Sequence, residues 1–190
     1  MNQSSRAPMQ PEFDEVKATE AAAIIIRESG GTIGPLRLLK LLYLADRRAW
    51  QEWERPISFD TYASLPAGPI LNTTYNIIKD TAPGRGEFWR RFIERVDNRT
   101  LRLREMPPIK RLSQAEASLL GATVTRYLRL DDSSLVRLTH KLPEYEDPGE
   151  SSLPILLPTL LKALKFSEEE IREVHAELRA EAELDSILSD

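Results

Sequence analysis

The segment that most constrains the fold starts at Pro35 and is apolar around most of a helical circumference. Proline suits the first turn of a helix, and the apolar residues that follow it are not confined to one face. They are Leu36, Leu38, Leu39, Leu41, Leu42, Tyr43, Leu44 and Ala45. Other elements normally surround such a helix. We therefore expect it at the centre of the core, ending at Arg55-Pro56.

Amphipathic helical patterns lie on both sides of this segment. Acidic residues in the first turn and helical apolar spacing predict a helix over residues 12–29, which a Gly-Gly pair ends. Capping boxes at Ser113 and Ser167 each predict a helix start, and a polar cap at Ser133 or Ser134 predicts another. The helices expected after the central one cover residues 69–79, 113–131, 133–140, 155–165 and 167–188.

One region predicts β-structure. Residues 92–105 contain two short apolar–polar alternations around Asp97-Asn98, which suit a turn. Residues 56–69 form a connection that is too apolar for a floppy loop, and residues 1–11 have the polar, proline-containing composition of a disordered lead. We therefore expect a mainly α, compact single-domain helical bundle over residues 12–188, with one small β-hairpin.

The composition fits one domain in a reducing compartment. The 190 residues are 41% hydrophobic, enough for a single core, and contain no cysteine. The sequence shows neither a signal peptide nor an apolar run of about 18 residues. We therefore expect a cytoplasmic protein without membrane contact. With a net charge of −4 the chain as a whole lacks the strong positive field that attracts nucleic acid, which argues against a nucleic-acid partner.

No cofactor or metal site is expected, and we favour a protein that is not an enzyme. His140 and His175 lie far apart, and neither has a second histidine three or four residues away. Phosphate-loop and serine-hydrolase motifs are absent. Lys40 interrupts an apolar helix and could be an activated amine, although extension of its stem to the surface explains it better. An alternative hypothesis makes His140 an acid or base oriented by Asp46 or Glu144.

Two segments carry opposite charge. Residues 85–111 contain nine basic and four acidic residues, a net charge of +5, and residues 167–190 contain two and nine, a net charge of −7. The two segments could pair within the fold, pair between protomers, or receive a partner of opposite charge. Phe88, Trp89 and Phe92 are interleaved with the basic residues. A nucleic-acid-binding regulator that uses residues 85–111 is therefore the alternative function.

Four segments, taken together, resemble the Panacea domain, which also occurs in GepA-like phage-associated proteins. They are LKLLYLADR at residues 39–47, PI at 56–57, DTYASLPAGPI at 60–70 and THKLPEY at 139–145. The resemblance extends over residues 12–188, and Tyr145 stands where many relatives have tryptophan. We expect the motif residues to hold the fold together: Lys40, Tyr43, Asp46, Tyr62, Gly68, Pro69, His140 and Pro143.

The resemblance implies a bacterial, prophage-associated antitoxin. Its partner would be a cognate protein toxin encoded nearby and neutralised by direct contact, and some relatives also present the toxin to an ATP-dependent protease. The resemblance implies no catalytic residues, and a homodimer is a further expected association. For the toxin-contact residues we select large aromatic, arginine and acidic side chains in segments that look irregular: Trp89, Arg91, Glu144 and Tyr145. Core packing is nearly as good an explanation of Trp89 as partner contact.

Overall fold

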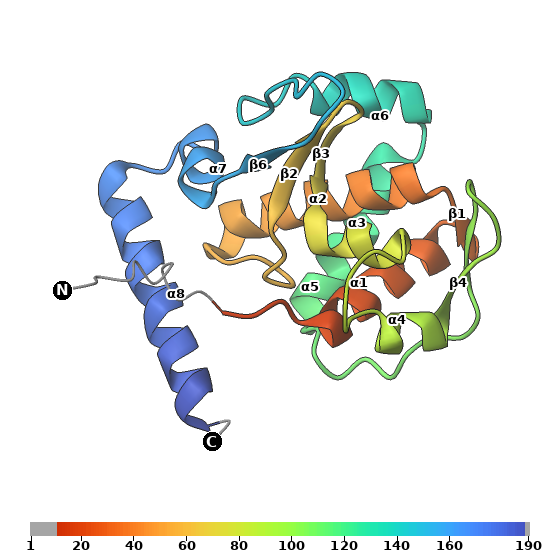
Figure 1. Cartoon of the computed structure of the whole chain (residues 1–190), viewed down its shortest axis with the longest axis horizontal. Coiled ribbons are helices and arrows are strands. Elements are labelled where there is room, and N and C mark those ends of the chain that lie inside the picture. The colour runs from red at the N-terminus through yellow and green to blue at the C-terminus, as the bar shows by residue number, and fades with distance from the viewer. Residues whose placement is uncertain (1–10, 189–190) are drawn as a thin grey trace.

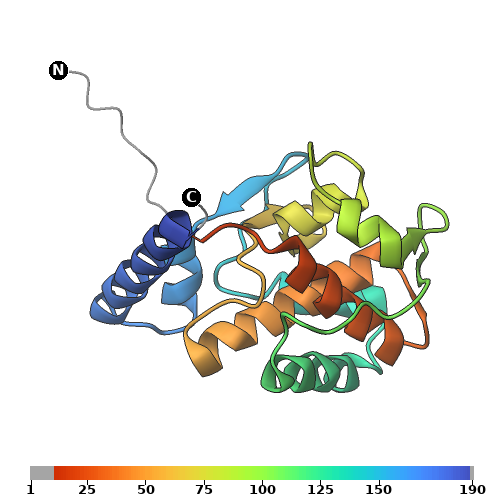
Figure 2. The ribbon, with the colours of Figure 1, turned by 90° about the horizontal axis from the view of Figure 1, so that it is seen from below.

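The computed structural model describes residues 11–188, with the expected helix at its centre (Figure 1). This helix, α2 (Pro35–Trp53), has proline in its first turn and eleven buried residues out of 19. It ends where Glu54 adopts a left-handed conformation with φ 56°. Helices α1 (Glu15–Glu28) and α5 (Gln114–Tyr127) pack against it on one side, and a small sheet covers the opposite side (Figure 2). The start and the central burial of α2 are confirmed.

Within the described residues the chain forms eight helices and two three-stranded sheets. The other helices are α3 (Asn72–Ile78), α4 (Glu87–Phe92), α6 (Asp132–Thr139), α7 (Leu157–Ala163) and α8 (Glu168–Leu188). The strands are β1 (Thr32–Ile33), β2 (Tyr62–Leu65), β3 (Gly68–Leu71), β4 (Ile93–Arg95), β5 (Leu101–Leu103) and β6 (Leu153–Ile155). The chain is mainly helical, as predicted, but it contains more β-structure than one hairpin.

The predicted hairpin exists, and the prediction that it stands alone is wrong. Strands β4 and β5 pair antiparallel, with Glu94 opposite Arg102, and the short strand β1 joins the free side of β5. The second sheet has the order β3-β2-β6 and is antiparallel throughout. Nearly every residue of β2 and β3 is buried. The alternation of apolar and polar residues that reveals a half-exposed strand is therefore missing from both.

Several helix boundaries also differ from the predictions. The helix expected over residues 69–79 starts at Asn72, because the preceding residues form β3. The helix expected over residues 155–165 is α7, which starts later, at Leu157. Ile155 belongs to strand β6, and Leu156 lies between the strand and the helix. Helix α6 is capped by the side chain of Asp131 rather than by a serine. The six-residue helix α4 was not expected.

Helix α8 stands at the edge of the molecule, where it packs on α7 and leaves much of its surface open (Figures 1 and 2). The predicted capping box is present, since Ser167 and Glu170 bond each other's backbone N–H groups. The apolar residues near its end, Ile187 and Leu188, are 69% and 82% exposed. The disordered lead predicted over residues 1–11 lies outside the described residues, apart from Pro11.

Three acidic side chains anchor loops by accepting backbone N–H groups. Glu20 of α1 is fully buried, and its carboxylate accepts the N–H groups of Lys110, Arg111 and Leu112 at 2.9 to 3.2 Å. Glu15 does the same for the start of α4, and Asp60 for the start of α3. A buried carboxylate bonded in this way replaces the strand or helix partner that the loop lacks.

Removing the Glu20 carboxylate tests this anchoring. We expect Glu20→Ala to lower the free energy of unfolding by about 3 kcal/mol, because three backbone N–H groups lose their acceptor. Glu20→Gln keeps one acceptor oxygen and should lose about half as much. Urea denaturation measures both, with the exposed Glu28→Ala of the same helix as the control, expected to cost less than about 0.5 kcal/mol. Equal losses for Glu20→Ala and Glu28→Ala would contradict the anchoring role.

Candidate interaction site

Lys40 lies on the face of α2 that meets the turn between β2 and β3. Its ammonium group donates a hydrogen bond to the Pro69 carbonyl at 2.7 Å, and the residue is only 1% exposed. Burial lowers the pKa of Lys40 to about 7. The expected extension of its stem to the surface is therefore wrong, because the Pro69 carbonyl offers the ammonium group an acceptor inside the protein.

Gly68 is required next to Lys40 for two reasons. Its φ of +97° is a conformation that other residues rarely adopt. A Cβ atom at this position would lie 2.8 Å from Thr139 Oγ1 and 2.9 Å from Lys40 Nζ. The same Cβ would lie 3.0 Å from Cδ2 of His140. The Gly68 backbone therefore joins α2, α6 and the β2–β3 turn at a single point.

Glu144 is buried and links the loop after α6 to α2. Its carboxylate accepts hydrogen bonds from the Tyr43 hydroxyl at 2.9 Å and from Arg47 Nε at 2.7 Å. Arg47 forms an ion pair with the same carboxylate and is partly buried beside it. Burial and the negative charge of Glu144 raise the pKa of Tyr43 well above its usual value, which keeps this hydroxyl a donor.

Asp46 joins the end of α2 to the connection that follows it. Its carboxylate accepts the N–H of Ile57 at 2.7 Å and the hydroxyl of Tyr62, which in turn accepts a hydrogen bond from Trp50 Nε1 at 2.7 Å. Burial raises the pKa of Asp46 to about 6, although the bonds from Tyr62 and Ile57 oppose the shift. Each buried polar group of this chain of bonds has a partner.

His140 and Tyr145 form the outer edge of the same region. Their rings stack in parallel, with centroids 4.5 Å apart, and the Tyr145 hydroxyl donates to the Leu65 carbonyl on the β2–β3 hairpin at 3.3 Å. His140 is exposed and Tyr145 is half-buried. Pro143 lies exposed in the turn between them. Motif segments 60–70 and 139–145, far apart in sequence, therefore meet at one surface.

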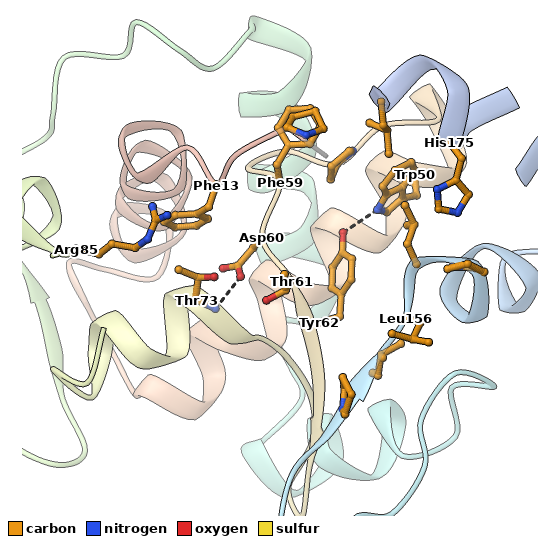
Figure 3. A pocket seen from close by; sticks show the side chains of 17 residues that line it. Phe13, Trp50, Phe59, Asp60, Thr61, Tyr62, Thr73, Arg85, Leu156 and His175 are labelled. Atoms are coloured by element: carbon orange, nitrogen blue, oxygen red, sulfur yellow. Dashed lines mark hydrogen bonds between the residues drawn. The ribbon is translucent and has the colours of Figure 1, made fainter. Parts of the chain in front are cut away.

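A cavity of about 700 Å³ lies between α8 and the second sheet (Figure 3). Trp50 and Tyr62 form part of its wall, and His175 and Leu178 of α8 lie on the other side. One cation lines it, Arg85, whose guanidinium lies 5.4 Å from the centroid of the Phe13 ring. Further apolar residues that line it are Pro11, Phe13, Pro56, Phe59, Pro154, Ile155, Leu156, Leu157 and Pro158.

The structure separates the four residues selected as toxin contacts into two kinds. Trp89 is 3% exposed and packs in the core, and Glu144 is 4% exposed and holds Tyr43. Neither side chain is open to a partner in this arrangement. Arg91 is exposed, close to the rings of Phe88 and Phe92, and Tyr145 is half-buried. The selected segments face outward, whereas two of the selected side chains point inward.

Four of the nine basic residues of segment 85–111 form ion pairs with carboxylates. Arg102 and Arg104 pair with Glu94 at 2.7 and 3.8 Å, and Arg90 pairs with Asp80 at 3.1 Å. Arg111 pairs with Asp14 on α1. On the acidic helix α8, Glu181 pairs with Arg55 and Glu168 with Lys162. The two segments thus use partners other than each other in these ion pairs.

The catalytic arrangement considered for His140 is not assembled in the described chain. Asp46 is bonded to Ile57 and Tyr62, Glu144 to Tyr43 and Arg47, and the His140 ring stacks on Tyr145. Over residues 11–188, no three His, Asp or Glu side chains gather as a metal site would require. In the same part of the chain, no helix has the length and apolar character needed to cross a membrane.

The hydrogen bonds of Lys40, Tyr43, Asp46 and Glu144 are buried within the chain. These motif residues therefore position the segments that form the surface. The sequence model of one family, described as "Antitoxin SocA-like, Panacea domain", matches residues 38–145. The match covers more than half of the chain, so the protein belongs to this antitoxin-like family. The matched region runs from α2 to Tyr145 and contains every bond of the network described above. No curated protein and no solved structure matches the chain.

Replacement of Gly68 tests its double requirement. We expect Gly68→Ala to lower the free energy of unfolding by about 3 kcal/mol, because backbone strain and the clash with Thr139 and Lys40 add together. Gly84 also has a positive φ, of 68°, but its Cβ would meet nothing within 4 Å. Gly84→Ala should therefore cost only the strain, about 1 kcal/mol. Urea denaturation compares them, and similar losses would refute the steric part.

The buried ammonium of Lys40 makes the stability depend on pH in a defined direction. The pKa of Lys40 is about 7 when folded and 10.5 in the ordinary case, so between these values the unfolded chain binds more protons. The free energy of unfolding should then rise with pH, by up to about 1.4 kcal/mol per unit above pH 7. We expect Lys40→Met to remove this rise. Urea denaturation at several pH values up to about 9 measures both slopes, and equal slopes would contradict the expectation.

Proposed function

We propose that this protein is a cytoplasmic antitoxin that neutralises a cognate protein toxin by direct binding. Membership of the antitoxin-like family supports the general role. The single observation that carries the direct-binding proposal is the closed network around α2. Lys40, Asp46 and Glu144 are buried and bonded within the chain, so they shape a surface and leave no reactive group free to a substrate.

The contact surface that we propose contains Tyr145 and Arg91, which are accessible. Tyr145 is stacked on His140 and tied to Leu65, so its ring loses little conformational freedom when a partner covers it. Aromatic and arginine side chains held in this way often dominate binding energy. Glu144 and Trp89 would act indirectly, because their burial holds in place the segments that carry Tyr145 and Arg91.

Direct binding can protect the cell by blockade of the toxin or by its delivery to an ATP-dependent protease. We propose blockade as the primary route, since it needs only the binding surface described above. The half-life of the toxin in cells distinguishes the two routes. A half-life that is unchanged by the antitoxin supports blockade, whereas one that shortens only when the protease is present supports delivery.

Co-expression with the product of the adjacent gene tests the proposal. We expect the product to arrest growth when expressed alone, and the pair to grow and to co-purify as a complex. Arg91→Glu should weaken the complex by about ten- to a hundredfold without a change in melting temperature. Tyr145→Ala should weaken it by a similar factor and also lower the melting temperature, because it removes the stacking on His140 and the bond to Leu65, so binding is measured well below that temperature. Arg172→Glu on α8 is the matched control for the charge reversal. Growth arrest that persists in the pair, without a complex, would end the proposal for this gene product.

A further inference from the structure

A second cavity, of about 720 Å³, opens beside the β4–β5 hairpin and is separate from the one under α8. We call it the hairpin groove. The start of α2, the β2–β3 turn, α3 and the turn of the β4–β5 hairpin surround it. Apolar side chains form much of its wall: Leu36, Leu39, Leu65, Ile70 and Ile78. Its volume is in the range of cavities that bind several ligand side chains or one small molecule.

The groove carries a concentration of positive charge. Lys79, Arg95 and Arg99 line it and are exposed, whereas Lys40, which also lines it, is buried and donates to the Pro69 carbonyl. Asp132 is the acidic residue among those that line it, and its carboxylate already pairs with Arg37 at 3.3 Å. In the part of the chain that the structure describes, Lys79, Arg95 and Arg99 have no carboxylate within ion-pair distance.

Arg95 is held in place by neutral acceptors. Its guanidinium donates to the carbonyl of Ile78 at 3.3 Å, to the carbonyl of Asp97 at 3.3 Å and to Asn98 Oδ1 at 2.7 Å. These bonds orient the guanidinium without neutralising it. Arg102, outside the groove, has a carboxylate partner instead. The Asp97 carboxylate itself accepts the backbone N–H of Arg99 at 2.7 Å and does not line the groove.

The start of α2 adds to the positive potential of the groove. Gly34 and Pro35 line it, and no side chain caps this helix. The N-terminus of a 19-residue helix attracts negative charge through its dipole and its free N–H groups. This contribution supplements the three cations and would be weak without them.

We propose that the hairpin groove binds an acidic segment of a protein partner, with one apolar side chain of that segment against the leucine and isoleucine wall. Charge complementarity favours an acidic segment. The apolar wall of the groove buries an apolar side chain of that segment, which adds affinity that charge alone does not give. The proposal rests on the proposed function, because the partner that it predicts is the toxin. The groove would then be the part of the interface that sets orientation and rate of association.

The same features favour a protein over a nucleic acid. A nucleic-acid strand needs a track of unpaired cations along its backbone, whereas Arg90, Arg102, Arg104 and Arg111 outside the groove are paired with carboxylates. Three exposed cations around an apolar wall match a short acidic peptide better than an extended polyanion.

A peptide selection tests the groove even while the toxin is unidentified. The full chain is used to select binders from a phage-displayed library of random dodecapeptides. We expect the enriched peptides to be acidic, with at least one large apolar residue. The double variant Lys79→Glu plus Arg99→Glu should weaken their binding at least about tenfold, because neither side chain makes a hydrogen bond that the fold depends on.

The matched control is the double variant Arg172→Glu plus Arg179→Glu, which changes the net charge equally on the exposed surface of α8, across the molecule from the hairpin (Figure 1). It should leave the affinity of the selected peptides unchanged. Enriched peptides without acidic residues would overturn the proposal, and so would equal effects of the two double variants. A labelled thymidine oligonucleotide that binds the groove in preference to the selected peptides would overturn it as well.

The two proposals can fail separately. If the wild-type protein neutralises the adjacent gene product and the Lys79 and Arg99 double variant does so with unchanged affinity, the groove proposal fails and the antitoxin proposal stands. If the adjacent gene product is not bound, but acidic peptides are bound and lost in the double variant, the antitoxin proposal fails for that product. The groove proposal then stands on the peptide result.

Discussion

The fold depends on giving the polar side chains of α2 partners inside the protein. A helix buried on all sides can carry Lys40, Tyr43 and Asp46 only if each makes hydrogen bonds, since an unpaired buried polar group costs a few kcal/mol. Each bond goes to a different segment: the Pro69 carbonyl, the Glu144 carboxylate and the backbone N–H of Ile57. The central helix therefore determines which loops lie against it, and at which residue.

The sequence predicts features that are set by neighbouring residues. The start of α2 at Pro35 and the capping box at Ser113 depend on contacts within a few residues, and both were predicted correctly. The second sheet depends instead on pairs such as Tyr62 with Ile155, which are distant in sequence. Strands β2 and β3 are buried on both faces, so they lack the alternation that would have revealed them. The sequence contains no local signal for such a pairing.

The candidate site shows the same division. The motif segments were identified from sequence, but which of the selected side chains point outward was not. Trp89 is buried because the Glu15 carboxylate accepts backbone N–H groups at the start of α4. Glu144 is buried because its carboxylate accepts hydrogen bonds from Tyr43 and Arg47. Glu15 lies 74 residues from Trp89, and Tyr43 lies 101 residues from Glu144. Their neighbours Arg91 and Tyr145 are left more accessible by the same contacts.

Charge summed along a segment locates attraction poorly, because ion pairs also join residues outside the segment. The +5 of residues 85–111 already counts Glu94, which Arg102 and Arg104 share, but it omits Asp80 and Asp14, which pair with Arg90 and Arg111. Arg95 differs because carbonyl oxygens hold it, so its field extends into the groove. Salt screens charges beyond about 10 Å, so the acidic helix α8, across the molecule, does not offset that field. A partner would therefore respond to the groove and not to the net charge of −4.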